Sequence, residues 1–178
     1  QVCAVGAGQI VRNTPFRRHH DMTREPRPNG EPNCKAEVKV ACALGNQACR
    51  QGLSVLFDRL PLLLEDLAVS HGDGSFRKRL AQLAKLDLLI LDDFGMATLN
   101  AHGRNDLLEV IEQRCGARST LITSQLPVDR RHDFLSGGNP TVADAILDRL
   151  VSGSHRIDLK GESMRKLKVR GKENAAAS

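Results

Sequence analysis

Two adjacent carboxylates, Asp92 and Asp93, directly follow the apolar run Leu-Leu-Ile-Leu at residues 88–91. Such a run is typical of a strand buried in a parallel sheet, and ligands of these sheets bind at the carboxyl ends of the strands. Four apolar residues and two acids form the Walker B pattern of P-loop ATPases, in which the first acid holds Mg²⁺ and the second orients the attacking water. A strand that simply ends at a solvated Asp-Asp turn has the same pattern.

Polar side chains also end the next predicted strand, which covers residues 119–123. Thr123, Ser124 and Gln125 are expected at the same sheet edge as Asp92. A hydroxyl or amide there could hydrogen-bond a γ-phosphate or the attacking water, although a turn rich in Ser and Thr is common at strand ends.

An arginine, Arg149, stands beside the inward leucines of a predicted helix at residues 142–151. It could reach a phosphate on a neighbouring subunit. It could equally form a local ion pair with Asp144 or Asp148.

Strand and helix patterns alternate along the chain, and the elements that they predict must position these residues. Strands are predicted at residues 54–57, 88–91, 119–123 and 155–159, with a further short one starting at Val2. Helices are predicted at residues 38–52, 60–69, 76–85, 105–115 and 142–151, and a loop at 126–140. This alternation predicts an α/β fold with three layers and a mostly parallel sheet.

The length of 178 residues suits one globular domain. Residues 1–40 hold four of the seven prolines and no apolar period, so we expect an irregular or disordered segment before a core at residues 41–160. Residues 161–178 form a basic tail.

Net charge is concentrated at the two ends of the chain. It is +3 over residues 1–40, −3 over residues 41–148 and +5 over residues 149–178. Basic ends favour an acidic partner such as DNA, although a solubilising tail gives the same pattern. With five Phe and no Trp or Tyr, phosphate contacts are expected rather than base stacking.

Five irregularly spaced cysteines and no recognisable secretory signal predict reduced thiols, a cytoplasmic location and no zinc site. No apolar run is long enough to span a bilayer, so no membrane association is expected.

Several segments together resemble the IstB/DnaC-like family of AAA+ ATPases, helpers of insertion-sequence transposition related to bacterial helicase loaders. The matching segments are Ala41–Cys49, Leu60–Asp66, Leu88–Gly95, Ser119–Pro127, Asp144–Leu150 and Lys160–Lys166. The resemblance implies a P-loop NTPase fold, bound ATP and Mg²⁺, and assembly into homo-oligomers on DNA with a transposase. It assigns Asp92 to the metal, Asp93 and Arg149 to catalysis, the latter as an arginine finger, and Thr123 and Ser124 to the nucleotide.

The phosphate loop of the family, GxxxxGK[S/T], is replaced here by residues 31–38, Glu-Pro-Asn-Cys-Lys-Ala-Glu-Val. Glu31 and Ala36 stand for the two glycines, Glu37 for the lysine and Val38 for the hydroxyl residue. A carboxylate in the lysine position repels a triphosphate. The N-terminal DNA-binding region of the family is not found either.

Two hypotheses therefore stand: an ATP-binding transposition helper, and a non-hydrolysing relative that keeps the fold and its DNA and protein contacts. A phosphorylatable receiver-like domain, with Lys160 as its lysine, is disfavoured. In that fold the acidic pair follows the first strand and a lone aspartate follows a later one, whereas here the Thr/Ser strand comes directly after the pair.

Overall fold

The structure is a computed structural model that describes residues 2–5, 17–18, 36–137 and 139–159. The helices are α1 (Ala36–Arg50), α2 (Leu60–Gly72), α3 (Phe76–Lys85), α4 (Ala101–Arg114), α5 (Val128–Ser136) and α6 (Pro140–Val151). The strands are β1 (Val2–Val5), β2 (Arg17–Arg18), β3 (Val55–Arg59), β4 (Leu88–Phe94), β5 (Ser119–Ser124) and β6 (Ser154–Ile157). Within these ranges, no helix has both the length and the apolar character that a membrane crossing requires.

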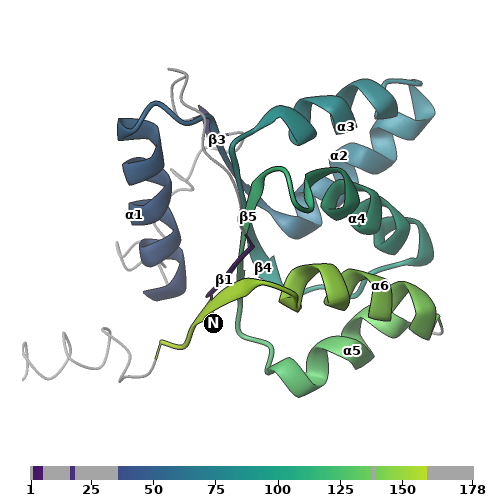
Figure 1. Cartoon of the computed structure of the whole chain (residues 1–178). Coiled ribbons are helices and arrows are strands. Elements are labelled where there is room, and N and C mark those ends of the chain that lie inside the picture. The colour runs from purple at the N-terminus through teal and green to yellow at the C-terminus, as the bar shows by residue number, and fades with distance from the viewer. Residues whose placement is uncertain (1, 6–16, 19–35, 138, 160–178) are drawn as a thin grey trace, which may run out of the picture.

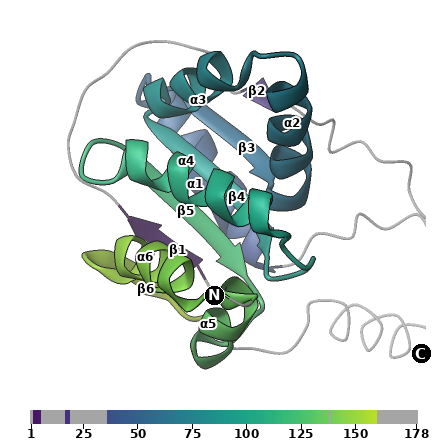
Figure 2. The same ribbon diagram turned by 90° about the vertical axis from the view of Figure 1, so that its right-hand side faces the viewer.

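The strands form one sheet in the order β2-β3-β4-β5-β1-β6 (Figures 1 and 2). Strands β2, β3, β4 and β5 pair in parallel, whereas β1 is antiparallel to both of its neighbours, so β6 runs in the same direction as β5. The predicted α/β fold with a mostly parallel sheet is confirmed. The carboxyl ends of β4 and β5 meet at one edge of the sheet, where the two acids and the Thr/Ser pair follow.

Helices cover the sheet on both faces and give the expected three layers. Helix α1 lies alone on one face, and the other helices lie on the opposite face (Figure 1). The α1 side buries a small cluster: Val38, Ala41, Ala48, Val55, Phe57, Ile90 and Leu121. The opposite side holds a larger cluster, which includes Leu89, Leu91 and Ile122 from alternate positions of the same strands. This alternation is what strands buried on both faces require.

Helix α5 corrects one expectation, because residues 126–140 were predicted to form a loop. Pro127 and Gly137 suggested that loop, but in the structure they bound a helix. Pro127 is the residue before its first turn, and Gly137 ends it with a left-handed φ of 40°. Such a φ favours glycine. A Cβ on Gly137 would also lie 2.1 Å from Nη1 of Arg104, so the buried Arg104 leaves no room for a side chain there.

Other boundaries shift by a few residues. Helix α4 begins four residues earlier than predicted because Asn100 caps it, accepting a hydrogen bond of 2.7 Å from the backbone N–H of Gly103. The strand expected near Val2 is present as β1. Most of the segment predicted to be irregular, and the basic tail, lie outside the described residues, so the division into 1–40, 41–160 and 161–178 stays a prediction.

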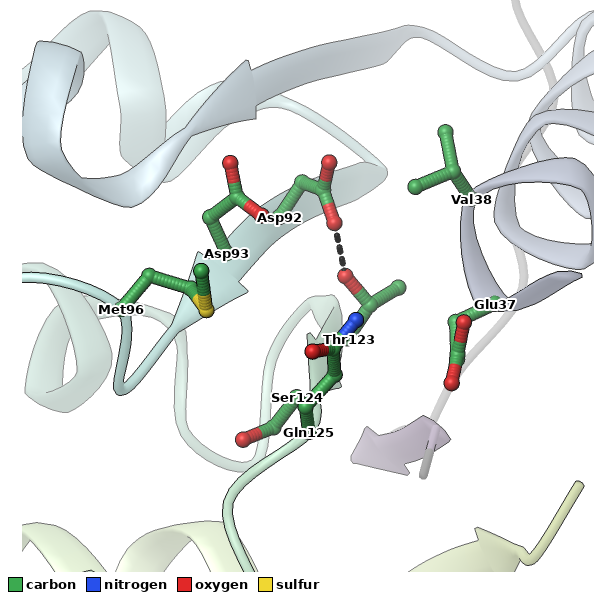
Figure 3. A pocket seen from close by; sticks show the side chains of 8 residues that line it. All are labelled: Glu37, Val38, Asp92, Asp93, Met96, Thr123, Ser124 and Gln125. Carbon is green, nitrogen blue, oxygen red and sulfur yellow. Dashed lines mark hydrogen bonds between the residues drawn. The ribbon is translucent and has the colours of Figure 1, made fainter. Parts of the chain in front are cut away.

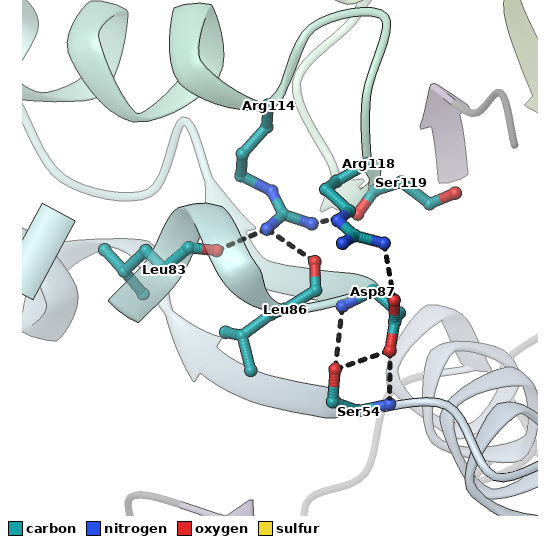
Figure 4. Close-up of polar contacts among 7 residues, drawn as sticks. All are labelled: Ser54, Leu83, Leu86, Asp87, Arg114, Arg118 and Ser119. Atoms are coloured by element: carbon teal, nitrogen blue, oxygen red, sulfur yellow. Dashed lines mark hydrogen bonds and ion pairs between the residues drawn. The ribbon is translucent and has the colours of Figure 1, made fainter. Parts of the chain in front are cut away.

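The amino-terminal ends of β3, β4 and β5 are tied together by the buried side chain of Arg114 and its neighbours (Figure 4). Arg114 donates hydrogen bonds to the carbonyl oxygens of Leu83, Leu86 and Ser119, and its Nε donates to Oγ1 of Thr120 at 3.0 Å. Burial, and then the charge of Arg118, lowers the pKa of Arg114 to about 10.

Asp87, the residue directly before β4, is hydrogen-bonded to Ser54, the residue directly before β3. Its carboxylate accepts hydrogen bonds from the backbone N–H and the hydroxyl of Ser54, at 2.9 and 2.6 Å, and lies 2.7 Å from Nη1 of Arg118. Burial alone would raise the pKa of the Asp87 carboxyl. The hydrogen bonds from Ser54 and the charges of Arg118 and Arg114 outweigh burial and hold this pKa below its ordinary value of 3.8. This network fixes one end of the sheet and so helps to set the strand register at the other end.

Candidate functional site

Asp92 and Thr123 meet at the carboxyl edge of the sheet, as the sequence predicts. The hydroxyl of Thr123 donates a hydrogen bond to Oδ1 of Asp92, and both side chains are buried (Figure 3). They line a pocket of about 210 Å³, counting its part open to solvent, with Asp93, Ser124, Gln125 and three residues from other segments: Glu37, Val38 and Met96.

A β-bulge explains how two consecutive acids line the same pocket. Leu91 pairs with Ile122 and Phe94 pairs with Ser124, so Asp92 and Asp93 together lie opposite Thr123 alone. Consecutive side chains of a regular strand point to opposite faces, and an extra residue re-aims one of them. Asp93 accommodates the bulge with a φ of 59°, a value that is rare for a residue with a side chain.

Arg59 is a site residue that the sequence interpretation missed. It ends β3 in register with Asp92, and its Nε lies 2.7 Å from Oδ2 of Asp93. The signal available in the sequence was a charged residue at the end of a buried strand, directly before the helix that Pro61 opens. The ion pair fixes the direction of the second acid.

Ser124 was predicted to bind the nucleotide, and its hydroxyl has a local structural role. It donates to the carbonyl oxygen of Phe94 at 2.7 Å and accepts from the backbone N–H of Leu126 at 3.0 Å. These bonds join the end of β5 to the end of β4. Its contact with a nucleotide stays a prediction.

Arg149, the predicted arginine finger, lies apart from this pocket within the chain. Its Nη2 pairs with Oε1 of Glu112, and its Nη1 donates to the carbonyl oxygen of Ala145 at 2.9 Å. The local partner is thus Glu112 on α4 and neither of the two aspartates considered from the sequence. Arg149 lines a second small pocket with Thr120, at the opposite end of β5 from Thr123.

The donor set at the pocket suits a divalent cation better than a triphosphate. Carboxylate and hydroxyl oxygens such as those of Asp92, Asp93 and Thr123 are ligands that Mg²⁺ prefers. The first turn of α1, however, brings Glu37 and Val38 to the other side of the pocket. A helix N-terminus favours an anion, but here that anion would meet a carboxylate, and the valine offers no oxygen to a metal. The pocket does not fit ATP.

The direction of β1 adds to this misfit. Val2 pairs with Thr123, at the pocket edge, and Val5 pairs with Thr120, at the far end of β5. The chain therefore leaves β1 at the sheet edge opposite the pocket. A phosphate-binding loop normally follows a parallel strand at the sheet edge where the phosphate lies, whereas β1 is antiparallel to β5 and ends at the opposite edge.

The fold is similar to those of two solved structures. It is similar to the structure of AMPPCP-bound DnaA from Aquifex aeolicus, with a TM-score of 0.56 and 15% identity over 76% of this chain and 42% of that chain. A second similar structure is that of a DNA replication initiation factor, with a TM-score of 0.54 and 18% identity over 74% of this chain and 39% of that one. At such identity the likeness shows the fold alone.

The sequence identifies the family. Residues 31–172 match the family described as IstB-like ATP binding protein, and the chain belongs to it. It is 55% identical over 127 residues to the insertion sequence ATP-binding protein y4pL of Sinorhizobium fredii, covering 71% of this chain and 51% of that protein. It is 64% identical over 96 residues to the IS1162 ATP-binding protein of Pseudomonas fluorescens, covering 54% and 42%. The chain spans about half the length of these relatives.

Proposed function

We propose that the chain is a helper protein of insertion-sequence transposition that assembles with further copies of itself on DNA and assists a transposase in the cytoplasm. Membership of the IstB-like family supports this proposal. The charge pattern supports it as well, because the basic excess lies at the two ends of the chain and leaves the core slightly acidic.

We further infer that the chain works without hydrolysing ATP. The observation that carries this inference is the pair Glu37 and Val38 at the pocket of Asp92. A like charge facing the phosphates raises the free energy of the bound state. The chain then corresponds to a family member that retains the fold and its macromolecular contacts.

Titration of a fluorescent ATP analogue into the full chain, with and without Mg²⁺, tests this inference. We expect no saturable binding in the micromolar range. Asp92→Ala is the matched control, because it removes the predicted metal ligand and should leave the flat titration unchanged. Micromolar, Mg²⁺-dependent binding that Asp92→Ala abolishes would contradict the inference and support the ATP-dependent helper.

DNA binding is tested with a short duplex at increasing salt. Deleting residues 161–178 removes Arg165, Lys166, Lys168, Arg170 and Lys172, so affinity and its salt dependence should both fall; each lost phosphate contact lowers the slope by about 0.9. The control is deletion of residues 174–178, which carry no charged side chain. Equal binding by both truncated chains would show that the tail contributes solubility only.

A further inference from the structure

One part of the sheet is covered on one face only. Helix α1 packs on β3, β4 and β5, whereas β1 contacts α6 on the other face; among the described elements, no helix packs on the α1 face of β1 and β6 (Figure 1). Because β1 is antiparallel to both of its neighbours, this part of the sheet can have one face in contact with solvent, and only apolar side chains exposed on that face would call for a cover. We call this part of the α1 face, over β1 and β6, the open face.

The strand register shows which residue of β6 belongs to the open face. Leu121 packs in the α1-side cluster, and Thr123, two residues further along β5, shares its face. Val2 pairs in register with both Thr123 and Ile157. Ile157 therefore lies on the α1 face, in the same row as Thr123, and its side chain is 42% exposed.

Helix α1 supplies the other border of the open face. Glu37 and Leu44 lie seven residues apart and so share one flank of the helix. Figure 3 shows Glu37 on the side of β1, whereas Val38 lies on the side of Asp92. Leu44 is 42% exposed. Two exposed apolar side chains, Leu44 and Ile157, thus face an uncovered strip of sheet with the carboxylate of Glu37 at its pocket end.

We propose that residues 160–172 of the same chain dock on the open face. The family match continues to residue 172, past the last described residue, Leu159, so this segment belongs to the family's domain. It begins where β6 ends, at the same sheet edge as the pocket. Neighbouring strands lie about 4.8 Å apart, so the pocket at Thr123 is roughly 10 Å from Ile157 and is within reach of a few residues.

The composition of residues 160–172 suits this surface. The segment carries six Lys or Arg and one Glu, together with the apolar residues Met164, Leu167 and Val169. Its apolar residues cover Leu44 and Ile157. Its Lys and Arg side chains can form ion pairs with the carboxylate of Glu37, which would repel a phosphate. Residues 6–16 are tethered less favourably, because they leave β1 at the opposite edge of the sheet. Residues 19–35 end next to Ala36 and Glu37, but they carry three Lys or Arg against three Asp or Glu and hold three prolines, so they lack the basic excess of residues 160–172.

Hydrogen exchange of the full chain, followed by mass spectrometry over residues 162–170, tests the proposal. We expect amides there to exchange about tenfold more slowly than an unstructured peptide. Ile157→Glu should remove this protection. Val69→Glu is the matched control, because Val69 is 69% exposed on α2, on the other side of the sheet, and should leave the protection in place.

Three outcomes would overturn the proposal. Residues 162–170 could exchange freely in the unmodified chain, or stay equally protected in Ile157→Glu. Protection could also disappear on dilution, which would assign the open face to a second copy of the chain. Glu37→Gln tests the ionic contact by itself. A partial loss of protection would support the contact between Glu37 and the cations of the segment, and an unchanged exchange rate would rule that contact out.

Discussion

The guanidinium of Arg59, at the end of β3, holds the carboxylate of Asp93 across a distance of 2.7 Å, while Asp93 itself occupies a left-handed backbone conformation with a φ of 59°. Two opposing effects therefore act on one residue. The ion pair is partly exposed and contributes about 0.5 kcal/mol, whereas the backbone conformation costs a residue with a side chain about 1 kcal/mol relative to glycine.

Asp93→Gly is expected to leave the free energy of unfolding unchanged or to raise it by about 0.5 kcal/mol, because the relief of backbone strain offsets the lost ion pair. Asp93→Ala, which keeps a Cβ and loses the ion pair, should lower it by about 0.5 kcal/mol. Urea denaturation measures both, and Arg59→Ala gives the contribution of the ion pair alone. Equal stabilities for the Gly and Ala variants would mean that the bulge relaxes at no cost.

A substitution of Glu37 gives a second prediction. Glu37→Lys removes the repulsion at the pocket but restores neither the glycines of the family's loop nor the parallel strand direction that such a loop follows. We expect no micromolar ATP binding from this variant in the same fluorescence titration. Saturable, Mg²⁺-dependent binding would show that charge alone excludes the nucleotide and that the antiparallel direction of β1 is not an obstacle.

Arg149→Ala is expected to leave the chain folded, because the ion pair with Glu112 is partly exposed and contributes about 0.5 kcal/mol. If Arg149 acts across a subunit boundary, the variant should lower the fraction of oligomer that forms on duplex DNA, measured by light scattering. Glu112→Ala is the matched control, because it breaks the same pair and keeps the guanidinium. Equal loss of oligomer in both variants would assign Arg149 to the fold of its own subunit.

Asp87 gives a prediction for the dependence of stability on pH. Its pKa is lower in the folded chain than its ordinary value of 3.8, so its contribution to stability is present above that pH and is lost as the pH falls through the folded value. Asp87→Asn should lower the free energy of unfolding by about 2 kcal/mol at pH 7. The difference from the unmodified chain should shrink near pH 3.

Urea denaturation at the two pH values checks this prediction. Asp66→Asn serves as the control, since Asp66 is more than half exposed and lies 3.6 Å from Arg79. A gap between the Asp87 variant and the unmodified chain that stays constant between pH 7 and pH 3 would show that the carboxylate charge is not what stabilises the network.

The sequence predicted the elements whose pattern is local and regular. The strand before Asp92, the strand before Thr123 and the helices between them have clear apolar periods, and they bring Asp92 and Thr123 together as expected. Pro127 and Gly137 misled because the same residues serve loops and helix ends. The bulge at Asp93 and its partner Arg59 depend on pairing between β3, β4 and β5, which no local pattern records. The assigned roles of Asp93, Ser124 and Arg149 in catalysis or nucleotide binding stay predictions.

Among the residues that the structure describes, the apolar clusters on the two sides of the sheet differ greatly in size, with seven buried residues on the α1 side and eighteen on the other. Cooperative units with few buried apolar contacts open at a lower free energy than the rest of a domain. Helix α1 should therefore detach in a sub-global opening while β4, β5 and α4 remain folded. Since α1 carries Glu37 and Val38, each such opening would remove one wall of the pocket and leave Asp92 and Thr123 in place. The geometry of this site then depends on the least stable layer of the molecule.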